Sequence, residues 1–129
     1  MDGFREVNDR LGHAAGDAML VEAAARIQRS IGPTDVVGRV GGDEFAILHE
    51  HAVTGSSAEA LTERVLAGLR GPHTVNAQEA VLSTSAGLVV SPAAGILPDD
   101  LMRSAEAAMH AAKRQGRDRW ICTDARATA

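Results

Sequence analysis

Two adjacent carboxylates beside a pair of glycines form the segment with the clearest chemical potential, Gly41-Gly42-Asp43-Glu44. Glycines let the backbone come close to a ligand, and carboxylate oxygens are hard ligands that suit Mg²⁺. The segment therefore favours a ligand site that includes a divalent ion. An exposed acidic turn is the simpler explanation of such a tetrapeptide in isolation, so the interpretation depends on the residues around it.

Two other polar segments change that interpretation. Residues 2–17 read DGFREVNDRLGHAAGD, and residues 108–117 read AMHAAKRQGR. Together with RVGGDEF at residues 39–45, they resemble the GGDEF family of diguanylate cyclases. The usual elements of that family run D-x-F-K-x-x-N-D-x-x-G-H-x-x-G-D, then R-x-G-G-D-E-F, then A-M-Y-x-A-K-x-x-G-R. Three separated motifs in the family's order are far more specific than any one of them alone, and the resemblance extends from Met1 to about Trp120.

The resemblance implies an enzyme that joins two GTP molecules into the bacterial second messenger cyclic di-GMP. It also implies a mixed α/β fold related to nucleotidyl cyclases and polymerase palms, with Mg²⁺ or Mn²⁺ as the cofactor. Each half-site of that family holds one GTP, so the chemistry implies a two-fold homodimer. Other sensory or phosphodiesterase domains are expected in the full protein.

Asn8 and Asp17 match the positions that read guanine in the family, and Phe4 is expected to contact the substrate as well. The carboxylate of Asp17 can accept hydrogen bonds from the N1–H and N2–H₂ edge of guanine, which adenine lacks. An alternative role for Asp17 is the N-cap of a helix over residues 18–31. The two roles would compete for the same oxygen atoms.

Asp43 matches the metal-binding acid of the family, and the main-chain carbonyl of Met1 is expected beside the same ion. Glu44 matches the neighbour that helps to activate the attacking 3′-hydroxyl. Adjacent strand residues point to opposite faces, so the two acids cannot act identically unless the turn twists them together. Gly41 and Gly42 would admit the nucleotide closely.

Lys113 and Arg117 match the residues that grip the triphosphate, and their spacing predicts that both lie on one face of a helix. Their alternative role is that of cations complementing a helix C-terminus. Conservative departures from the family pattern, which leave the assignment intact, occur at Arg5, Glu106 and His110.

A further departure concerns product inhibition. The family's inhibitory motif R-x-x-D falls on Gly32-Pro33-Thr34-Asp35, so the aspartate is present but its arginine is replaced by Gly32. The guanidinium fork that would grip cyclic di-GMP is missing there. We therefore expect product inhibition by that route to be weak or absent.

The start of the chain departs most from the family. The family pattern reads D-x-D-x-F, and counting back from Phe4 places its second aspartate at Asp2 and its first ahead of Met1. The expected domain therefore covers residues 1–123 without its first strand, followed by a disordered tail at 124–129. With one metal carboxylate absent, we expect this chain to bind GTP but to turn it over poorly. The alternatives are a non-catalytic module that binds GTP or cyclic di-GMP, and a regulatory domain that acts only through protein contacts.

Several helices and strands must position these residues. Apolar spacing predicts helices over 18–31, from a capping box at 56–59 through Leu69, and from Pro98 to Gly116, with Met102, Ala105, Met109 and Ala112 facing inward. A hairpin is expected from strands 36–40 and 45–48 around a Gly-Gly turn, and a second over 73–90 with a strong strand at 81–90. A last strand is expected at 120–122. This order predicts helices around a mainly antiparallel sheet.

Composition excludes other classes. The 129 residues suit one domain, and the net charge of −4 with 2% aromatic residues argues against a nucleic-acid polymer as partner. The sequence contains no run long enough to span a bilayer and no signal peptide, so we expect a cytoplasmic domain without membrane contact. Cys122 is the only cysteine, which rules out an internal disulfide. His49 and His51 alternate like metal ligands, but exposed edge histidines are the simpler interpretation.

Overall fold

The computed structural model describes residues 1–49, 55–75, 77–90 and 97–124. Its elements follow in the order α1 (Phe4–Leu11), α2 (His13–Ser30), β1 (Val36–Arg39), β2 (Phe45–Leu48), α3 (Gly55–Leu69), β3 (Gly71–Val75), β4 (Gln78–Leu82), β5 (Ser85–Val90), α4 (Pro98–Arg114) and β6 (Arg119–Asp124). The mixed α/β class that the sequence predicts is confirmed. In the described part of the chain, no helix combines the length and the apolar character that a membrane span needs.

The strands form three pairs in the described residues rather than one continuous antiparallel sheet. β1 pairs antiparallel with β2, and β3 pairs antiparallel with β4. β5 and β6 instead run parallel, with Ser85 opposite Arg119 and Val90 opposite Asp124. Two of the three pairs are antiparallel, as the predicted mainly antiparallel arrangement requires, and the β5–β6 pair is parallel because α4 carries the chain back to the starting edge before β6 begins.

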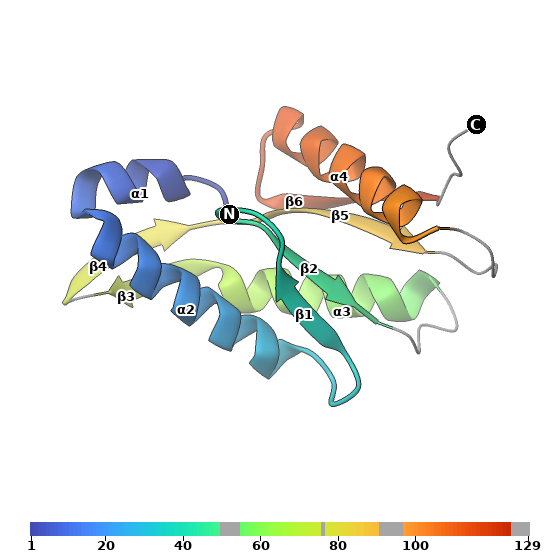
Figure 1. Ribbon diagram of the computed structural model, residues 1–129, viewed down its shortest axis with the longest axis horizontal. Helices are drawn as coiled ribbons and strands as arrows, with labels where there is room; N and C mark the ends of the chain where they lie inside the picture. Colours follow the sequence, from blue (N-terminus) through green and yellow to red (C-terminus); the bar gives the residue numbers. More distant parts are fainter. Residues whose placement is uncertain (50–54, 76, 91–96, 125–129) are drawn as a thin grey trace.

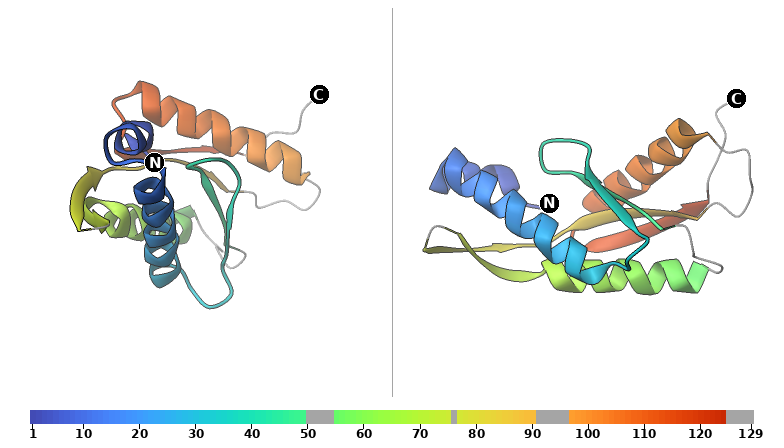
Figure 2. Two further views of the ribbon diagram at one scale, coloured as in Figure 1. Left: turned by 60° about the vertical axis from the view of Figure 1, so that its left-hand side comes forward. Right: turned by 60° about the horizontal axis from the view of Figure 1, so that its bottom comes forward.

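The β5–β6 pair lies between helices, with α4 on one face and α3 on the other (Figures 1 and 2). Gly87 makes the close packing of α4 possible, because a methyl group at that position would lie 2.0 Å from the carbonyl oxygen of Ala105 and 2.6 Å from the nitrogen of Met109. α2 packs against α3, and α1 folds back against α2.

Two groups of buried apolar residues hold the helices together. One joins α1 and α2 to the β3–β4 hairpin, and it includes Val7, Met19 and Leu82. The other joins α2 to α3, and it consists of Ala23, Ile27, Leu61, Val65 and Leu69. Leu61, Val65 and Leu69, which recur at helical spacing, are all buried.

Several element boundaries differ from the sequence prediction. The expected strand 81–90 is broken at Ser83 and Thr84, because the chain leaves β3 and takes up β6 as its new partner. α3 begins at Gly55, ahead of the expected capping box. α4 ends at Arg114, and Met102 on that helix is 38% exposed rather than inward. α1 was not expected, although Phe4, Val7 and Leu11 have helical spacing.

Candidate functional site at the hairpin turn

The predicted acidic segment lies at the turn of the β1–β2 hairpin. The amide of Val40 donates to the carbonyl oxygen of Glu44 at 3.0 Å, so the turn spans five residues rather than a two-residue Gly-Gly turn. Arg39 closes the turn from the side, because its Nε donates to the carbonyl oxygens of Gly41 at 3.0 Å and Gly42 at 3.1 Å.

The two glycines of the turn face different surroundings. A methyl group added at Gly41 would lie 3.3 Å from Oε2 of Glu44, whereas one at Gly42 would meet no protein atom within 4 Å. Neither glycine adopts a left-handed backbone conformation, so the turn itself does not require glycine at either position. The open space at Gly42 is compatible with the expected close approach of a nucleotide.

Asp43 and Glu44 diverge from each other. The main-chain nitrogen of Met1 donates to the carbonyl oxygen of Asp43 at 2.9 Å and lies 3.5 Å from its Oδ2. The side chain of Glu44 instead lies near Gly41. Asp43 faces a cavity of about 230 Å³ whose other lining residues are Phe4, Arg5, Asn8 and Gly42. The turn therefore does not give the two acids the same neighbours.

Asn8 sits at the junction of α1 and α2, and its Oδ1 is buried without a hydrogen-bond partner among the described residues. A methyl group on Gly16 would lie 1.7 Å from that oxygen, so glycine at position 16 makes room for the Asn8 side chain. Buried side-chain oxygens almost always find a partner, and Asn8 also lines the cavity that Asp43 faces, which makes this side chain a candidate contact for a ligand.

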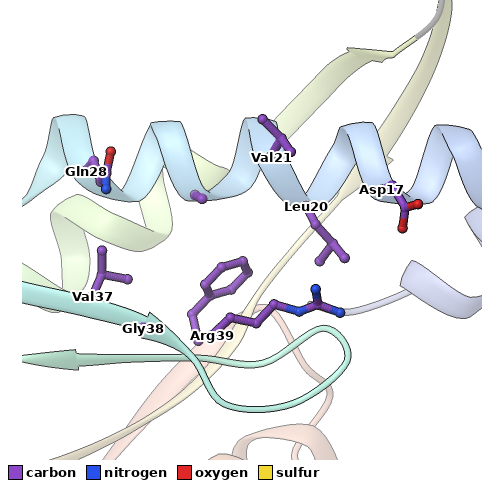
Figure 3. Close-up of a pocket in the computed structure, with 9 residues that line it drawn as sticks. Asp17, Leu20, Val21, Gln28, Val37, Gly38 and Arg39 are labelled. Atoms are coloured by element: carbon purple, nitrogen blue, oxygen red, sulfur yellow. The ribbon is translucent and has the colours of Figure 1, made fainter.

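A larger cavity of about 520 Å³ lies between α2 and the hairpin (Figure 3). Asp17 and Leu20 line it from α2, and Val37, Arg39 and Phe45 line it from the hairpin. α2 begins at His13 with Gly12 at the N-cap position, so the alternative role of Asp17 as a helix cap is wrong. The exposed carboxylate of Asp17 has no hydrogen-bond partner among the described residues.

The cations expected at the triphosphate do not share a helical face. Lys113 lies in the last turn of α4, but the helix ends at Arg114, and Arg117 adopts a left-handed conformation with φ of 64°. The next residue, Asp118, donates its amide to Oδ2 of Asp2 at 3.2 Å. The turn that carries Arg117 is therefore held beside the start of the chain, one residue from the Met1–Asp43 contact.

Asp2 acts as an anchor rather than as an open carboxylate. It is 8% exposed, and it accepts hydrogen bonds from the hydroxyls of Ser83 and Ser85, both at 2.7 Å, as well as from the Asp118 amide. Burial acts to raise the pKa of Asp2, but the hydrogen bonds from Ser83, Ser85 and Asp118 outweigh burial and lower the pKa below its usual value. Its lone pairs are committed to structure, which leaves few for a metal ion.

The segment that matches the inhibitory motif is also committed to internal bonds. Asp35 accepts from the Gly32 amide at 2.7 Å and pairs with Nδ1 of His49. The hydrogen bond from His49, followed by the one from Gly32, lowers the pKa of Asp35. His49 is thus a hydrogen-bond partner of Asp35 rather than a free edge residue, while His51 lies outside the described residues.

The donor set for a divalent ion is small. The described residues contain no cluster of three or more His, Cys, Asp or Glu side chains that could hold a metal. Asp43 offers one carboxylate, and the expected carbonyl of Met1 lies on an adjacent segment. Mg²⁺ is commonly bound by one or two carboxylates together with substrate phosphates and water. The residues present therefore fit an ion that arrives with a triphosphate.

Several residues that line these cavities, Arg39 among them, were not singled out as site residues from the sequence. Leu20 and Phe45 line the larger cavity, and Arg5 lines the smaller one. Leu20 and Phe45 also belong to the apolar patterns of α2 and β2. Those patterns predict burial in the core, and they give no sign that the two residues line a cavity. Arg5 lies within the first motif, at the position where the family pattern has lysine.

One family model matches most of this chain. The family described as "Diguanylate cyclase, GGDEF domain" matches residues 1–119. The bifunctional diguanylate cyclase/cyclic di-GMP phosphodiesterase MucR of Pseudomonas aeruginosa is 39% identical over 118 residues, which cover 92% of this chain but 17% of MucR. This chain therefore corresponds to a small part of that curated relative.

Solved structures give the same result. The GGDEF domain of TpbB (YfiN) from Pseudomonas aeruginosa superimposes with a TM-score of 0.79 at 36% identity, covering 97% of this chain and 72% of that chain. The GGDEF domain of DgcB from Caulobacter crescentus, solved in complex with c-di-GMP, has a TM-score of 0.77 at 26% identity and covers 96% of this chain and 72% of that chain. The palm-like fold expected from the sequence is confirmed.

Proposed function

The chain belongs to the GGDEF family of diguanylate cyclase domains, and on this premise we propose that it binds GTP at the hairpin turn and, as a pair of chains, condenses two GTP into cyclic di-GMP. The observation that carries the proposal is that Asn8, whose Oδ1 lacks a hydrogen-bond partner among the described residues, lines one cavity with Gly42 and Asp43. The N1–H and N2–H₂ groups of guanine are donors of the kind that this oxygen needs.

Asn8 and Asp17 would together recognise the base. Asn8 packs on Gly16, the residue directly before Asp17, so the two side chains belong to one region of the α1–α2 junction. The carboxylate of Asp17 has no hydrogen-bond partner among the described residues, so it would accept hydrogen bonds from the same edge of guanine. Phe4 lines the cavity with Asn8 and would contact the nucleotide through its ring. Adenine presents no N1–H and no N2–H₂, so the pair selects GTP over ATP.

The triphosphate would extend from Asn8 towards Gly42 and Asp43, which line the smaller cavity with Arg5. The open space at Gly42 lets phosphate oxygens reach the main chain. Lys113 and Arg117 add positive charge from the end of α4, where the Asp118–Asp2 hydrogen bond holds the turn. Guanidinium and ammonium groups form charge-assisted hydrogen bonds with phosphate oxygens, so they favour a nucleoside triphosphate over a nucleoside.

A divalent ion would be held by Asp43 and the main-chain carbonyl of Met1. When bound, such an ion would polarise the α-phosphate and lower the pKa of the attacking hydroxyl. In each half-reaction, the 3′-oxygen of one GTP forms a bond to the α-phosphorus of the other, and the bond from that phosphorus to the pyrophosphate oxygen breaks. The hydroxyl proton leaves, and Glu44 is the residue that would help to remove it. Each chain supplies one GTP, so the reaction requires a homodimer.

Mass spectrometry of the product tests the proposal. The full chain incubated with GTP and Mg²⁺ is expected to bind GTP and to yield cyclic di-GMP and pyrophosphate only slowly, and the Asp43→Asn variant is expected to yield neither product. Asp9→Asn, an exposed acid on α1 that lines neither cavity, is a matched control that should retain the parent's yield. Equal affinity of the chain for GTP and ATP in calorimetry would contradict the proposal.

A second candidate function is a non-catalytic module that binds GTP or cyclic di-GMP beside other domains. It is favoured by the small donor set, in which Asp43 offers one carboxylate while Asp2 is committed to Ser83 and Ser85. Binding of GTP without any product would support this candidate. Absence of binding for both nucleotides would instead favour a domain that acts through protein contacts alone.

A further inference from the structure

Arg39 has an unusual arrangement of donors. Its Nε donates hydrogen bonds to the carbonyl oxygens of Gly41 and Gly42. These bonds hold one edge of the guanidinium at the hairpin turn. Its two terminal nitrogens have no hydrogen-bond partner among the residues that the structure describes. A planar group held at one edge has lost much of its rotational freedom, so its remaining donors point in a nearly fixed direction.

These donors belong to the larger cavity rather than to the smaller one. Arg39 lines the 520 Å³ cavity with Asp17, Leu20, Val37 and Phe45, and it does not line the cavity of Asp43. Figure 3 shows the guanidinium extended below Leu20 towards the end of the cavity where Asp17 lies. The two charged groups form no ion pair within 4.0 Å, although nothing else described neutralises either of them.

The cavity therefore has a carboxylate at one end, a fixed guanidinium on its hairpin wall, and apolar side chains between them. Apolar walls with a few convergent polar groups are typical of sites for planar organic ligands. A purine could lie against Leu20, Val37 and Phe45 while its polar edges face the two charges. Phosphates do not suit this cavity, because its lining is largely apolar and Asp17 would repel them.

Guanine matches the two charges in chemical terms. Its N1–H and N2–H₂ groups donate to a carboxylate, and its O6 and N7 atoms accept from an arginine fork. Adenine carries an amino group in place of O6. Because that amino group is a donor, it would face the guanidinium donors without forming a hydrogen bond. We propose that Arg39 is a specificity-determining residue that binds the O6 and N7 edge of the guanine whose N1 and N2 edge lies at Asp17. This inference rests on the proposed binding of GTP.

The test uses GTP and 7-deaza-GTP, in which a C–H group replaces the N7 acceptor and the rest of the nucleotide is unchanged. Calorimetry on the full chain with Mg²⁺ is expected to give about tenfold weaker binding for 7-deaza-GTP, the size of one lost hydrogen bond in a bidentate pair. In Arg39→Gln the ratio of the two dissociation constants should fall to about one. A purely structural role for Arg39 at the turn would weaken both nucleotides equally and would leave the ratio at its parent value.

Arg64→Gln provides a matched control. Arg64 is also exposed and also donates through Nε to a main-chain carbonyl, that of Ser30 at 3.0 Å, but it lines neither cavity. This variant should keep the tenfold ratio. The parent chain alone also tests the inference, so the conclusion does not depend on the folding of Arg39→Gln.

The outcomes separate the two proposals. GTP preferred over ATP, with equal affinity for GTP and 7-deaza-GTP in the parent chain, would overturn the role of Arg39 and leave the proposed function standing. If the tenfold ratio of the two dissociation constants persists in Arg39→Gln, another group must bind N7. That result would also overturn the role of Arg39. Equal affinity for GTP and ATP would overturn the proposed function itself.

Discussion

Asn8 and Gly16 are packed so closely that a methyl group added at position 16 would lie 1.7 Å from Oδ1 of Asn8. Gly16→Ala must therefore displace the Asn8 side chain or separate α1 from α2. We expect a loss of about 1–3 kcal/mol in the free energy of unfolding, as for other overpacked sites. Chemical denaturation measures this loss. In an Asn8→Ala background the same substitution should cost much less, because the clashing oxygen is gone; an unchanged cost would contradict the contact as its cause.

Asp17→Ala should reduce the preference for GTP over ATP without changing stability. The residue lies inside α2 rather than at its N-cap, and its carboxylate has no hydrogen-bond partner among the described residues, so folding does not depend on it. Loss of its hydrogen bonds to guanine is expected to cost about 1–3 kcal/mol of nucleotide discrimination. Competition binding measures the preference, and thermal unfolding of the same samples checks stability. A large drop in melting temperature would contradict the placement of Asp17.

The stability of the domain should fall in acid because of Asp2. Its folded-state pKa is lowered below the unfolded value of about 3.8, so in that interval the unfolded chain binds more protons than the folded chain. The stabilisation from Asp2 is complete above the unfolded pKa and is lost as the pH falls through the folded pKa. Asp2→Asn should therefore weaken the acid dependence of the free energy of unfolding below about pH 4.

An exposed acid serves as the control for this pH dependence. Asp9→Asn on α1 should leave the acid limb of the stability curve unchanged, because the side chain of Asp9 is exposed and makes no hydrogen bond among the described residues. At neutral pH, Asp2→Asn is expected to destabilise the fold by about 1–3 kcal/mol, since the buried hydroxyls lose a charged acceptor. Identical acid limbs for the parent and Asp2→Asn would contradict the role of Asp2.

Gly87→Ala should be among the most destabilising small substitutions in the chain. The added methyl group would meet main-chain atoms of α4 at 2.0 Å and 2.6 Å, and backbone cannot move aside as a flexible side chain can. We expect a loss of about 3 kcal/mol, at the upper end of the usual cost of overpacking. Gly38→Ala, where no protein atom lies within 4 Å, is the stability control. Equal unfolding midpoints for the two variants would contradict the packing of α4 on β5.

Cyclic di-GMP should inhibit weakly, if at all, through residues 32–35. Gly32 lacks the side chain that the motif needs, and Asp35 is occupied by His49 and the Gly32 amide. A progress curve with added cyclic di-GMP, or calorimetry on the full chain, measures this. Restoring the arginine by Gly32→Arg should not create tight binding unless His49→Ala also frees Asp35. Potent non-competitive inhibition of the parent chain would show that other residues grip the product.

The sequence predicted the helices better than the strands. Periodic apolar residues identified α2, α3 and α4, because their buried faces follow local spacing. It did not predict that the segment 81–90 changes partner at Ser83, since that depends on Asp2 and on β6, which are distant in sequence. The same distinction applies to the candidate site: the motifs predicted roles for Asn8 and Asp43, but only the fold showed that Asp17 and Arg39 line one cavity.

The anchoring of Asp2 has a consequence for how the protein is made. Its carboxylate joins Ser83, Ser85 and Asp118, which are separated from it by 81, 83 and 116 residues along the chain. Closure of such long loops comes late, because its entropy cost must be met before the contacts form. During synthesis from the N-terminus, this junction cannot be completed until residue 118 has left the ribosome. Nascent chains that lack β6 should therefore remain protease-sensitive around α1, and protection of that helix should appear with the last strand.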